Sequence, residues 1–303
     1  MTARARWLPG GAHTRSTLAA DFERLGVRAG STVLVHASLR RIGAVRPWRE
    51  PHAGRAGPDD PVAATVLAAL RHVLGPRGTL VVPTFTEGNS STSRAYRERI
   101  AGMTAEQVAG YRASMPPFDP DTSPSQGMGR FAEAVRRAPG AYRSGHPQTS
   151  FAALGARAAR LAAHHDGNCH LGPDSPLGPL HRDRSPGTLI LLIGVGYEVC
   201  SAFHLAEYLR PDPPTRDYSC VVRRGGRPQW ITYRDVELDD SDFADLGTAY
   251  EKADTDRRER RVNSGTVGDA DARGLALHHA VDFAAQWLAG NRPRPVESYE
   301  LRS

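Results

Sequence analysis

The stretch Leu189-Ile190-Leu191-Leu192-Ile193-Gly194-Val195-Gly196 decides the fold class of this 303-residue chain. Its large apolar side chains follow one another without alternating with polar ones, which is typical of a strand covered on both faces. The glycines that follow indicate a turn into the next element. The segments Thr32-Val33-Leu34-Val35-His36-Ala37 and Thr79 to Phe85 have the same character. We therefore expect several buried strands that belong to one sheet.

Helical patterns precede, separate and follow these strands. Apolar residues recur at helical spacing between capping residues and terminal glycines, as in the segment from Asp60 to Gly75. The expected helices span residues 14–26, 60–75, 105–112, 127–138, 156–165, 199–209, 242–250 and 270–288. A short strand is expected at 151–154, and a hairpin with arms at 218–223 and 229–233 around Gly225-Gly226. This alternation predicts one α/β domain that covers residues 1–303, with a core at about 14–290.

Charge and cysteine content exclude several classes of protein. Lys and Arg number 39 against 33 Asp and Glu, which gives a net charge of +6. The basic residues are scattered or alternate with acids, as between Glu251 and Arg261, so we expect no nucleic-acid partner. Three cysteines without C-x-x-C spacing predict neither a disulfide framework nor a structural zinc. No apolar run is long enough for a membrane span, and residues 1–9 lack a signal-peptide core, so we expect a cytoplasmic protein.

Most of the common catalytic motifs are absent from the sequence. It contains no Walker A loop, no G-x-S-x-G elbow and no H-E-x-x-H. Gly194-Val195-Gly196 lies between a strand and a helix, but Val199 replaces the third glycine of a dinucleotide fingerprint. The pairs His164-His165 and His278-His279 point to different sides of their helices, and we interpret them as solvated or core histidines.

The segment from Cys200 to Glu207 is the strongest local candidate for chemistry. His204 and Glu207 are three residues apart and share a helix face, and Cys200 lies four residues before His204. The segment follows the end of a buried strand, where open α/β sheets place their ligand crevices. A base, a carboxylate and a thiol could therefore meet at this edge of the sheet.

Two further segments concentrate polar groups. Arg143 to Ser150 contains hydroxyls and an imidazole, and Gly172 to Pro176 forms a tight loop. From spacing alone, Asp174 and Ser175 are best interpreted as caps of a short helix that starts at Pro176.

Taken in order, these segments resemble the aminoglycoside 3-N-acetyltransferase family, antibiotic acetyltransferases that are distinct from the GNAT superfamily. The similarity extends from about Thr14 to Trp287. The matching stretches are 33–39, 78–85, 118–120, 123–125, 128–129, 143–147, 150–155, 174–177, 192–197, 204–207, 239–247 and 265–271.

The resemblance implies a fold and a reaction. The fold is a single layered α/β/α domain with a central mixed, partly parallel sheet. The reaction is acetylation of an amine of a cationic antibiotic, the 3-amino group of 2-deoxystreptamine, with acetyl-CoA as co-substrate and without metal. His204 corresponds to the catalytic base of the family. An imidazole suits this role, since its reference pKa of about 6.5 allows proton uptake near neutral pH. Glu207 or Asp174 would orient the ring, and the sequence does not rank them.

The resemblance also assigns binding residues. The positions on the coenzyme side are Ser38, Ser123, Ser125, Ser144, His146 and Ser150, with Arg40 and Arg130 as additional basic groups. The positions on the acceptor side are His36, Glu87 and Asp119. The expected partner is a small-molecule amine, and the chain is expected to be a monomer or a homodimer.

The sequence departs from the family pattern in two places. The variable loop at 45–61 contains an insertion from Arg46 to Gly57 near the expected acceptor side, and Ser201 replaces a common threonine. Because the net charge is +6, a less cationic amine of a biosynthetic pathway is also compatible. Two other readings stay open: an acyl-enzyme on Cys200, and a non-catalytic homologue that binds CoA or an antibiotic.

Overall fold

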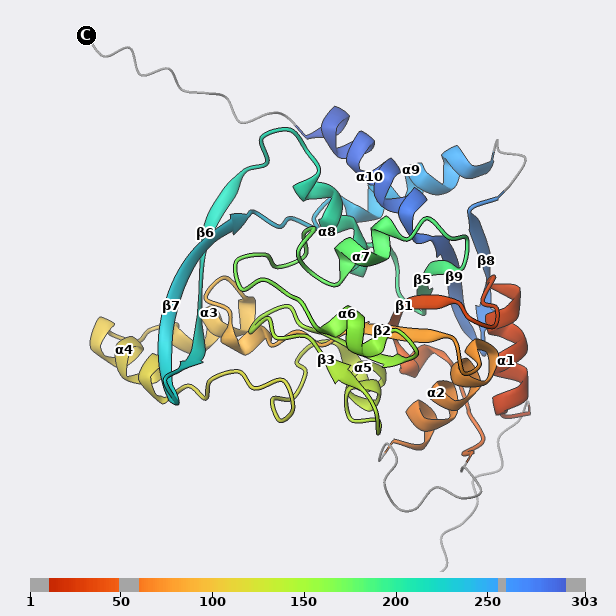
Figure 1. Cartoon of the computed structure of the whole chain (residues 1–303), viewed down its shortest axis with the longest axis horizontal. Helices are drawn as coiled ribbons and strands as arrows, with labels where there is room; N and C mark the ends of the chain where they lie inside the picture. The colour runs from red at the N-terminus through yellow and green to blue at the C-terminus, as the bar shows by residue number, and fades with distance from the viewer. Residues whose placement is uncertain (1–10, 49–59, 256–259, 293–303) are drawn as a thin grey trace, which may run out of the picture.

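A mixed sheet forms the centre of the computed structural model, which describes residues 11–48, 60–255 and 260–292. Its seven strands lie in the order β3-β4-β2-β1-β5-β9-β8 (Figure 1). They are β1 (Thr32–Ala37), β2 (Thr79–Pro83), β3 (Tyr142–Arg143), β4 (Phe151–Gly155), β5 (Thr188–Ile193), β8 (Val262–Val267) and β9 (Ala270–Ala276). Strand β1 pairs in parallel with β2 and β5, whereas the outer pairs are antiparallel. The expected mixed, partly parallel sheet is confirmed.

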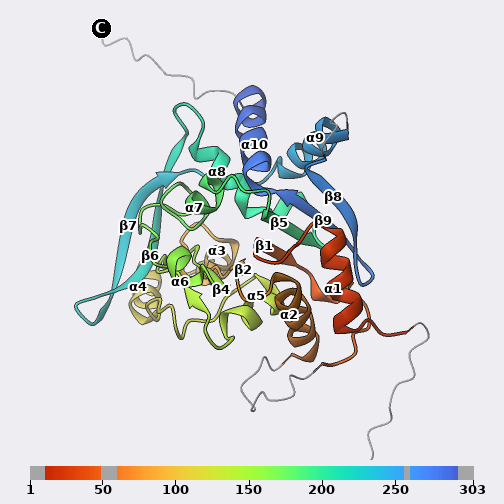
Figure 2. The ribbon, with the colours of Figure 1, turned by 45° about the vertical axis from the view of Figure 1, so that its right-hand side comes forward.

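Helices cover both faces of this sheet (Figure 2). On one face lie α1 (Arg15–Arg24), α2 (Pro61–Leu74) and α5 (Gly129–Arg136). On the other lie α6 (Ala158–Ala162), α7 (Leu177–Arg182), α8 (Ser201–Tyr208), α9 (Phe243–Thr255) and α10 (Leu277–Asn291). The three layers agree with the expectation from sequence. In the described parts of the chain, no helix has both the length and the apolar character needed to cross a membrane.

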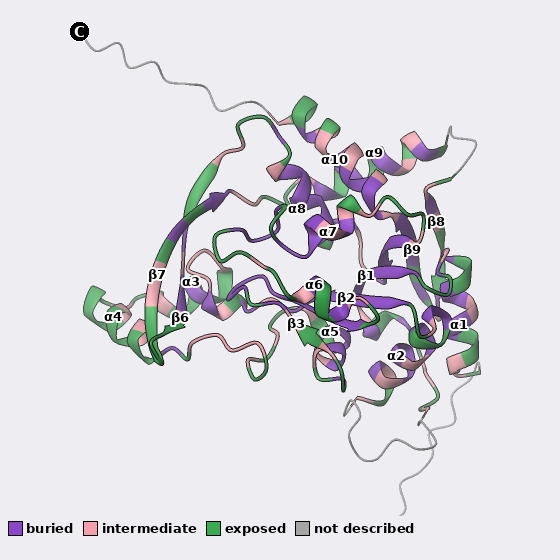
Figure 3. Cartoon of the chain, viewed as in Figure 1, coloured by how far each residue is buried: buried purple, intermediate pink, exposed green. Residues whose placement is uncertain are grey.

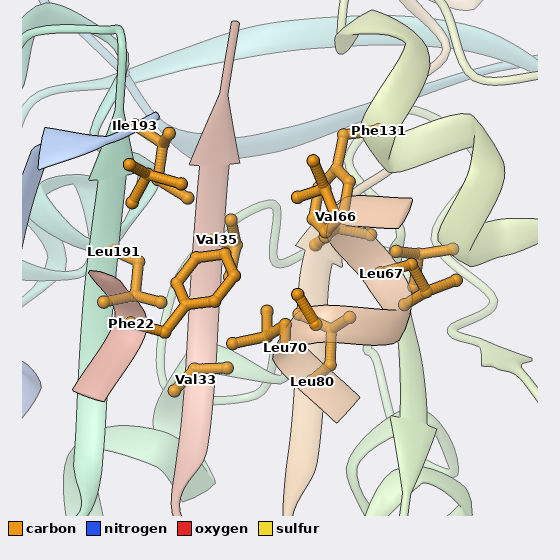
Figure 4. Close-up of a cluster of buried hydrophobic side chains, with 14 of the residues drawn as sticks. Phe22, Val33, Val35, Val66, Leu67, Leu70, Leu80, Phe131, Leu191 and Ile193 are labelled. Atoms are coloured by element: carbon orange, nitrogen blue, oxygen red, sulfur yellow. The ribbon is translucent and has the colours of Figure 1, made fainter. Parts of the chain in front are cut away.

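The central strands have two buried faces, as their unbroken apolar runs predict. In β1, Val33 and Val35 pack against α1 and α2, and Leu34 packs on the opposite face. Figure 4 shows Phe22 and Leu70 over the first of these faces. All five side chains are at most 1% exposed, and each contributes about 1.5–3 kcal/mol relative to full exposure. Figure 3 shows the same concentration of buried residues along the sheet.

A separate two-stranded hairpin, β6 (Thr215–Arg224) and β7 (Arg227–Val236), lies beside the main domain and confirms the expected hairpin. Asp235 anchors β7 to the domain. Its carboxylate accepts hydrogen bonds from the backbone N–H of His170 (2.7 Å), from the Nδ1 of the same residue (2.8 Å) and from the Tyr208 hydroxyl (2.6 Å). Nearer the tip, Trp230 stacks on Tyr96 with ring centroids 5.7 Å apart.

Two expectations about local structure were wrong. The segment 270–288 is not one helix, because residues 270–276 form β9, which pairs with β5 and with the unexpected strand β8. Its small residues suit a helix locally, but pairing with a central strand outweighs that preference. Gly274 fits this position because a Cβ would lie 2.1 Å from the Leu25 carbonyl oxygen. The segment 86–126 holds two helices, α3 (Arg94–Ile100) and α4 (Ala105–Ser114), where one was expected.

The variable loop at 45–61 is described only at its two ends. Val45 forms an isolated bridge with His13, and the backbone N–H of Trp48 donates to the Thr65 hydroxyl. Residues 49–59, and with them most of the insertion at 46–57, lie outside the described residues.

Candidate active site

A cleft of about 730 Å³ opens at the carboxyl ends of β1, β2 and β5. This is the edge of a parallel sheet where ligand crevices are expected. The side chains that could contribute chemistry to its lining are His36, Ser38, Arg40, Glu87, Arg130, Glu198, Ser201, His204 and Asp240. Among the sequence-predicted residues, the cleft therefore brings together His204, two of the three acceptor-side candidates (His36 and Glu87) and the coenzyme-side candidate Ser38.

His204 and Glu207 form a hydrogen-bonded pair on α8. The Nδ1 of His204 lies 2.7 Å from Oε2 of Glu207, and the two side chains are 14% and 2% exposed. An ionised carboxylate can only accept, so Nδ1 carries a proton and donates it to this bond. The neutral ring then keeps its lone pair on Nε2, and the imidazole lies in the cleft wall. This tautomer is the one that a general base requires.

The second oxygen of Glu207 is held from outside the helix. Its Oε1 accepts from the backbone N–H of Asp239 (2.9 Å) and from Nη1 of Arg292 (2.5 Å). The Nε of Arg292 also donates to Asp242 (2.8 Å). Burial works against the guanidinium charge, but the hydrogen bonds to Asp242 and Glu207 outweigh it and raise the pKa of Arg292. The Phe243 ring packs on the His204 ring with centroids 4.7 Å apart, so both members of the pair are fixed.

His36 is a second imidazole in the cleft, but it has a different environment. Its side chain is buried and its Nε2 lies 3.3 Å from the Ser201 hydroxyl. Burial, with a smaller contribution from the positive charge of a protonated His204, lowers the pKa of His36 to about 4. His36 is therefore neutral at physiological pH, and no carboxylate is hydrogen-bonded to it among the described residues. Of the two rings, His204 is the one equipped to accept and stabilise a proton.

Acidic side chains also line the cleft, although the chain as a whole is basic. Glu87, Glu198 and Asp240 all contribute to its lining. Partial burial raises the pKa of Glu87. Glu198 and Asp240 were missed by sequence reasoning. The position of Glu198, directly after the turn that ends β5, was a signal that could have indicated it, whereas Asp240 follows the distant hairpin.

Asp174, the alternative partner for His204, does not contact this pair. It is exposed, it is not part of the cleft lining, and its carbonyl oxygen accepts from the backbone N–H of Asp166 (3.1 Å). The neighbouring Ser175 accepts from the backbone N–H of Leu177 at the start of α7. Ser175 thus bonds to the first N–H of the helix, but the N-cap residue is Pro176, and the helix begins one residue later than expected.

Five coenzyme-side candidates lie outside the cleft lining, where their polar groups hold loops together. The Ser125 hydroxyl donates to Glu133 (2.8 Å), and the Ser150 hydroxyl donates to the Thr84 carbonyl oxygen (3.0 Å). The Ser144 hydroxyl accepts from the backbone N–H of Phe151 (2.9 Å).

The remaining two candidates and Asp119 also bond to nearby backbone. The buried His146 accepts at Nδ1 from the backbone N–H groups of Gln148 and Thr149. The Ser123 hydroxyl accepts from the backbone N–H of Asp119 (3.0 Å). The carboxylate of Asp119, which also lies outside the cleft lining, accepts from the two backbone N–H groups that follow it in its turn, and these bonds lower its pKa.

Cys200 is buried and does not line the cleft. Burial raises the pKa of its thiol to about 12. In the described parts of the chain, no group of three or more His, Cys, Asp or Glu side chains is arranged to hold a metal ion.

A family model described as aminoglycoside 3-N-acetyltransferase matches residues 34–289. The chain belongs to the aminoglycoside 3-N-acetyltransferase family. This membership makes the protein an acyltransferase. It is 36% identical over 285 residues to aminoglycoside N(3)-acetyltransferase VII of Streptomyces paromomycinus, with 91% of each chain covered. It is 31% identical over 291 residues to the prophage-derived acetyltransferase-like protein YokD of Bacillus subtilis, with 94% of this chain and 95% of YokD covered.

Solved structures of this acetyltransferase family have the same fold. The crystal structure of YokD from Bacillus subtilis superposes with a TM-score of 0.79 at 30% identity, covering 93% of this chain and 95% of YokD. AAC-IIIb in a binary complex with CoASH gives 0.74 at 26% identity, with 94% and 100% covered. AAC-VIa bound to sisomicin gives 0.70 at 28% identity, with 92% and 98% covered.

Proposed function

We propose that the protein transfers the acetyl group of acetyl-CoA directly to the 3-amino group of a 2-deoxystreptamine aminoglycoside, with His204 as general base. The observation that carries this proposal is the 2.7 Å bond between Nδ1 of His204 and Glu207, which leaves Nε2 as the basic atom in the cleft wall. The binding of CoASH by AAC-IIIb and of sisomicin by AAC-VIa supports these two substrates.

The residues of the chain supply the proton transfer and the orientation. Acetyl-CoA supplies the acetyl group as a thioester. The acceptor ammonium loses one proton to solvent, and Nε2 of His204 removes a second as the nitrogen attacks the carbonyl carbon. Glu207 stabilises the imidazolium that forms. When the C–S bond breaks, the electron pair goes to the CoA sulfur as the new C–N bond is completed, and the imidazolium returns its proton to that thiolate.

The acidic lining of the cleft fits a cationic acceptor. Glu87, Glu198 and Asp240 place negative charge near His204, which attracts an aminoglycoside despite the positive net charge of the chain. His36 contributes a neutral hydrogen-bonding group on the same wall.

For the coenzyme we keep Ser38 as a direct contact, since it lines the cleft. Arg40 and Arg130 line the same cleft and are suited to the anionic part of acetyl-CoA. We infer that the other five coenzyme-side candidates act by holding the loops behind the cleft, because their polar groups bond to neighbouring segments.

The test is release of free thiol from acetyl-CoA with a panel of 2-deoxystreptamine aminoglycosides. Turnover that is lost in His204→Ala, with CoA binding intact, supports the proposal. Cys200→Ala should keep near-normal turnover, because the thiol is buried and its raised pKa keeps it protonated. Loss of all activity in a folded Cys200→Ala variant would instead require the acyl-enzyme route.

Two other experimental results would contradict the proposed acceptor or the proposed activity. Tight CoA binding without turnover on any of these aminoglycosides would direct the search to a different amine. A His204→Ala variant that changes only ligand affinity, in a protein that never turns over, would indicate a non-catalytic binding protein.

A further inference from the structure

A second cavity, of about 520 Å³, lies at the opposite end of the sheet from the catalytic cleft. Leu189 at the start of β5 lines this cavity, whereas Val195 just beyond the end of β5 lines the cleft. At about 3.3 Å per residue, the two sites are roughly 20 Å apart along the strand. The polar side chains of the second cavity are Arg184, Arg260, Arg261, Asn263, His278 and His279. Among the described residues, its lining thus carries basic groups and no carboxylate.

The first turn of α10 forms one wall of this cavity. Ala276, His278 and His279 all line it, and Ala276 is the N-cap residue, whose side chain makes no capping hydrogen bond. The first turn of the helix contains no acidic residue. Unbonded N–H groups and the helix dipole at such a start favour an anion. Helical side chains also lean toward the N-terminus, so the two imidazoles lie over this end.

His278 independently indicates a missing ligand. Its side chain lines the cavity, the residue is only 7% exposed, and its Nδ1 has no hydrogen-bond partner within the described parts of the chain. A buried polar atom without a partner costs about 1–3 kcal/mol, so native proteins rarely leave one. Burial, followed by the nearby charge of Arg184, lowers the pKa of His278. A neighbouring anion would offset both effects.

Two carboxylates near the cavity, among the residues that the structure describes, are already engaged. Asp282 on α10 accepts from His181 (2.7 Å) and from Arg184. Asp254 accepts from the backbone N–H of Arg261 (2.9 Å), which fixes the chain there while the side chain of Arg261 remains in the cavity lining. Among the described residues, the positive charges of Arg260 and Arg261 therefore face the cavity.

We propose that this cavity binds a phosphate-type oxyanion, held by Arg261, His278 and the first-turn N–H groups of α10. Free inorganic phosphate and the terminal group of a phosphomonoester share this chemistry. The site is separate from the acetyl-transfer cleft and does not depend on the reaction proposed for that cleft.

Isothermal titration with inorganic phosphate and with glycerol 3-phosphate, at low ionic strength, tests the site. The wild-type protein should bind at least one of them saturably. Arg261→Gln and His278→Gln should each weaken binding about tenfold or more, the effect of losing one charged or buried hydrogen bond. Tighter binding of glycerol 3-phosphate would identify a phosphate ester as the ligand. Equal or tighter binding of inorganic phosphate would identify the free ion as the ligand.

Two control variants locate the bound ion. Arg77→Gln removes the same charge from an exposed turn and should leave binding unchanged. If Arg130→Gln, in the catalytic cleft, abolishes binding while Arg261→Gln and His278→Gln do not, the ion lies in the cleft and the proposal is wrong. It is also wrong if neither probe binds saturably at millimolar concentration. Circular dichroism checks the fold of each variant. If Arg261→Gln does not fold, phosphate binding by His278→Gln tests the proposal instead.

Discussion

The substitution Glu207→Gln tests the proposed role of the carboxylate while nearly preserving its shape. Oε1 of Glu207 accepts from two donors, the backbone N–H of Asp239 and the side chain of Arg292, so this position must remain an oxygen. The amide NH₂ of glutamine would then face Nδ1 of His204, where Oε2 now lies 2.7 Å away. Two donors cannot share this bond, so the imidazole proton moves to Nε2.

The size of the effect follows from what is lost. The Nε2 atom in the cleft would no longer be a base, and general-base catalysis typically contributes about 10²–10⁴-fold to a rate. We therefore expect kcat to fall by about 10²–10⁴-fold, with little change in the KM for acetyl-CoA, because Glu207 lies behind His204 and does not line the cleft. Initial-rate thiol release measures both constants. A folded variant that keeps a kcat within a few-fold of the wild type, or one in which only KM changes, would contradict this role of Glu207.

Three further predictions concern stability. Arg292→Met removes the cation that pairs with Glu207, whose carboxylate stays buried. We therefore expect the free energy of unfolding, measured by chemical denaturation, to fall by about 3–5 kcal/mol, together with a reduced kcat. Unchanged stability would contradict this. Asp235→Asn weakens the bonds that anchor the hairpin and should increase amide exchange across β7, whereas exchange at wild-type rates would show that the hairpin is held elsewhere. Hydrogen bonds from Arg136 and Ser125 outweigh burial and lower the pKa of Glu133 to about 2 from 4.5. Its stabilisation is therefore complete above pH 4.5 and lost as pH falls toward 2, and Glu133→Gln should flatten urea-melt stability over this interval; an equally steep profile in the variant would refute that assignment.

Local sequence patterns predicted the central strands and the pairing of His204 with Glu207. The unbroken apolar runs of β1 and β5 can be satisfied only by burial on both faces, so their location needed no knowledge of the rest of the chain. His204 and Glu207 are one helical turn apart, and the helix alone brings them together. The sequence left Asp174 as an equal candidate because its position relative to His204 depends on how a loop folds.

Features that depend on distant contacts were missed. Strand β9 has an alanine-rich sequence that suits a helix, and its pairing with β5 and β8 makes it extended. Arg292 reaches Glu207 across 85 residues of sequence, and Asp240 enters the cleft from beyond the hairpin. No local pattern connects such positions, because the tertiary fold rather than residue spacing brings them together.

The length of helix α10 fixes the distance between the basic cavity at its start and Arg292 just after its end. It begins beside the basic cavity and ends directly before Arg292, which holds Glu207. Its 15 residues span about 22 Å, close to the depth of the sheet between the two sites. One inserted residue would move Arg292 by about 1.5 Å and rotate it by about 100° away from the carboxylate. The length of this helix is thus constrained from both ends, and insertions or deletions within it should be tolerated far less than substitutions on its outer face.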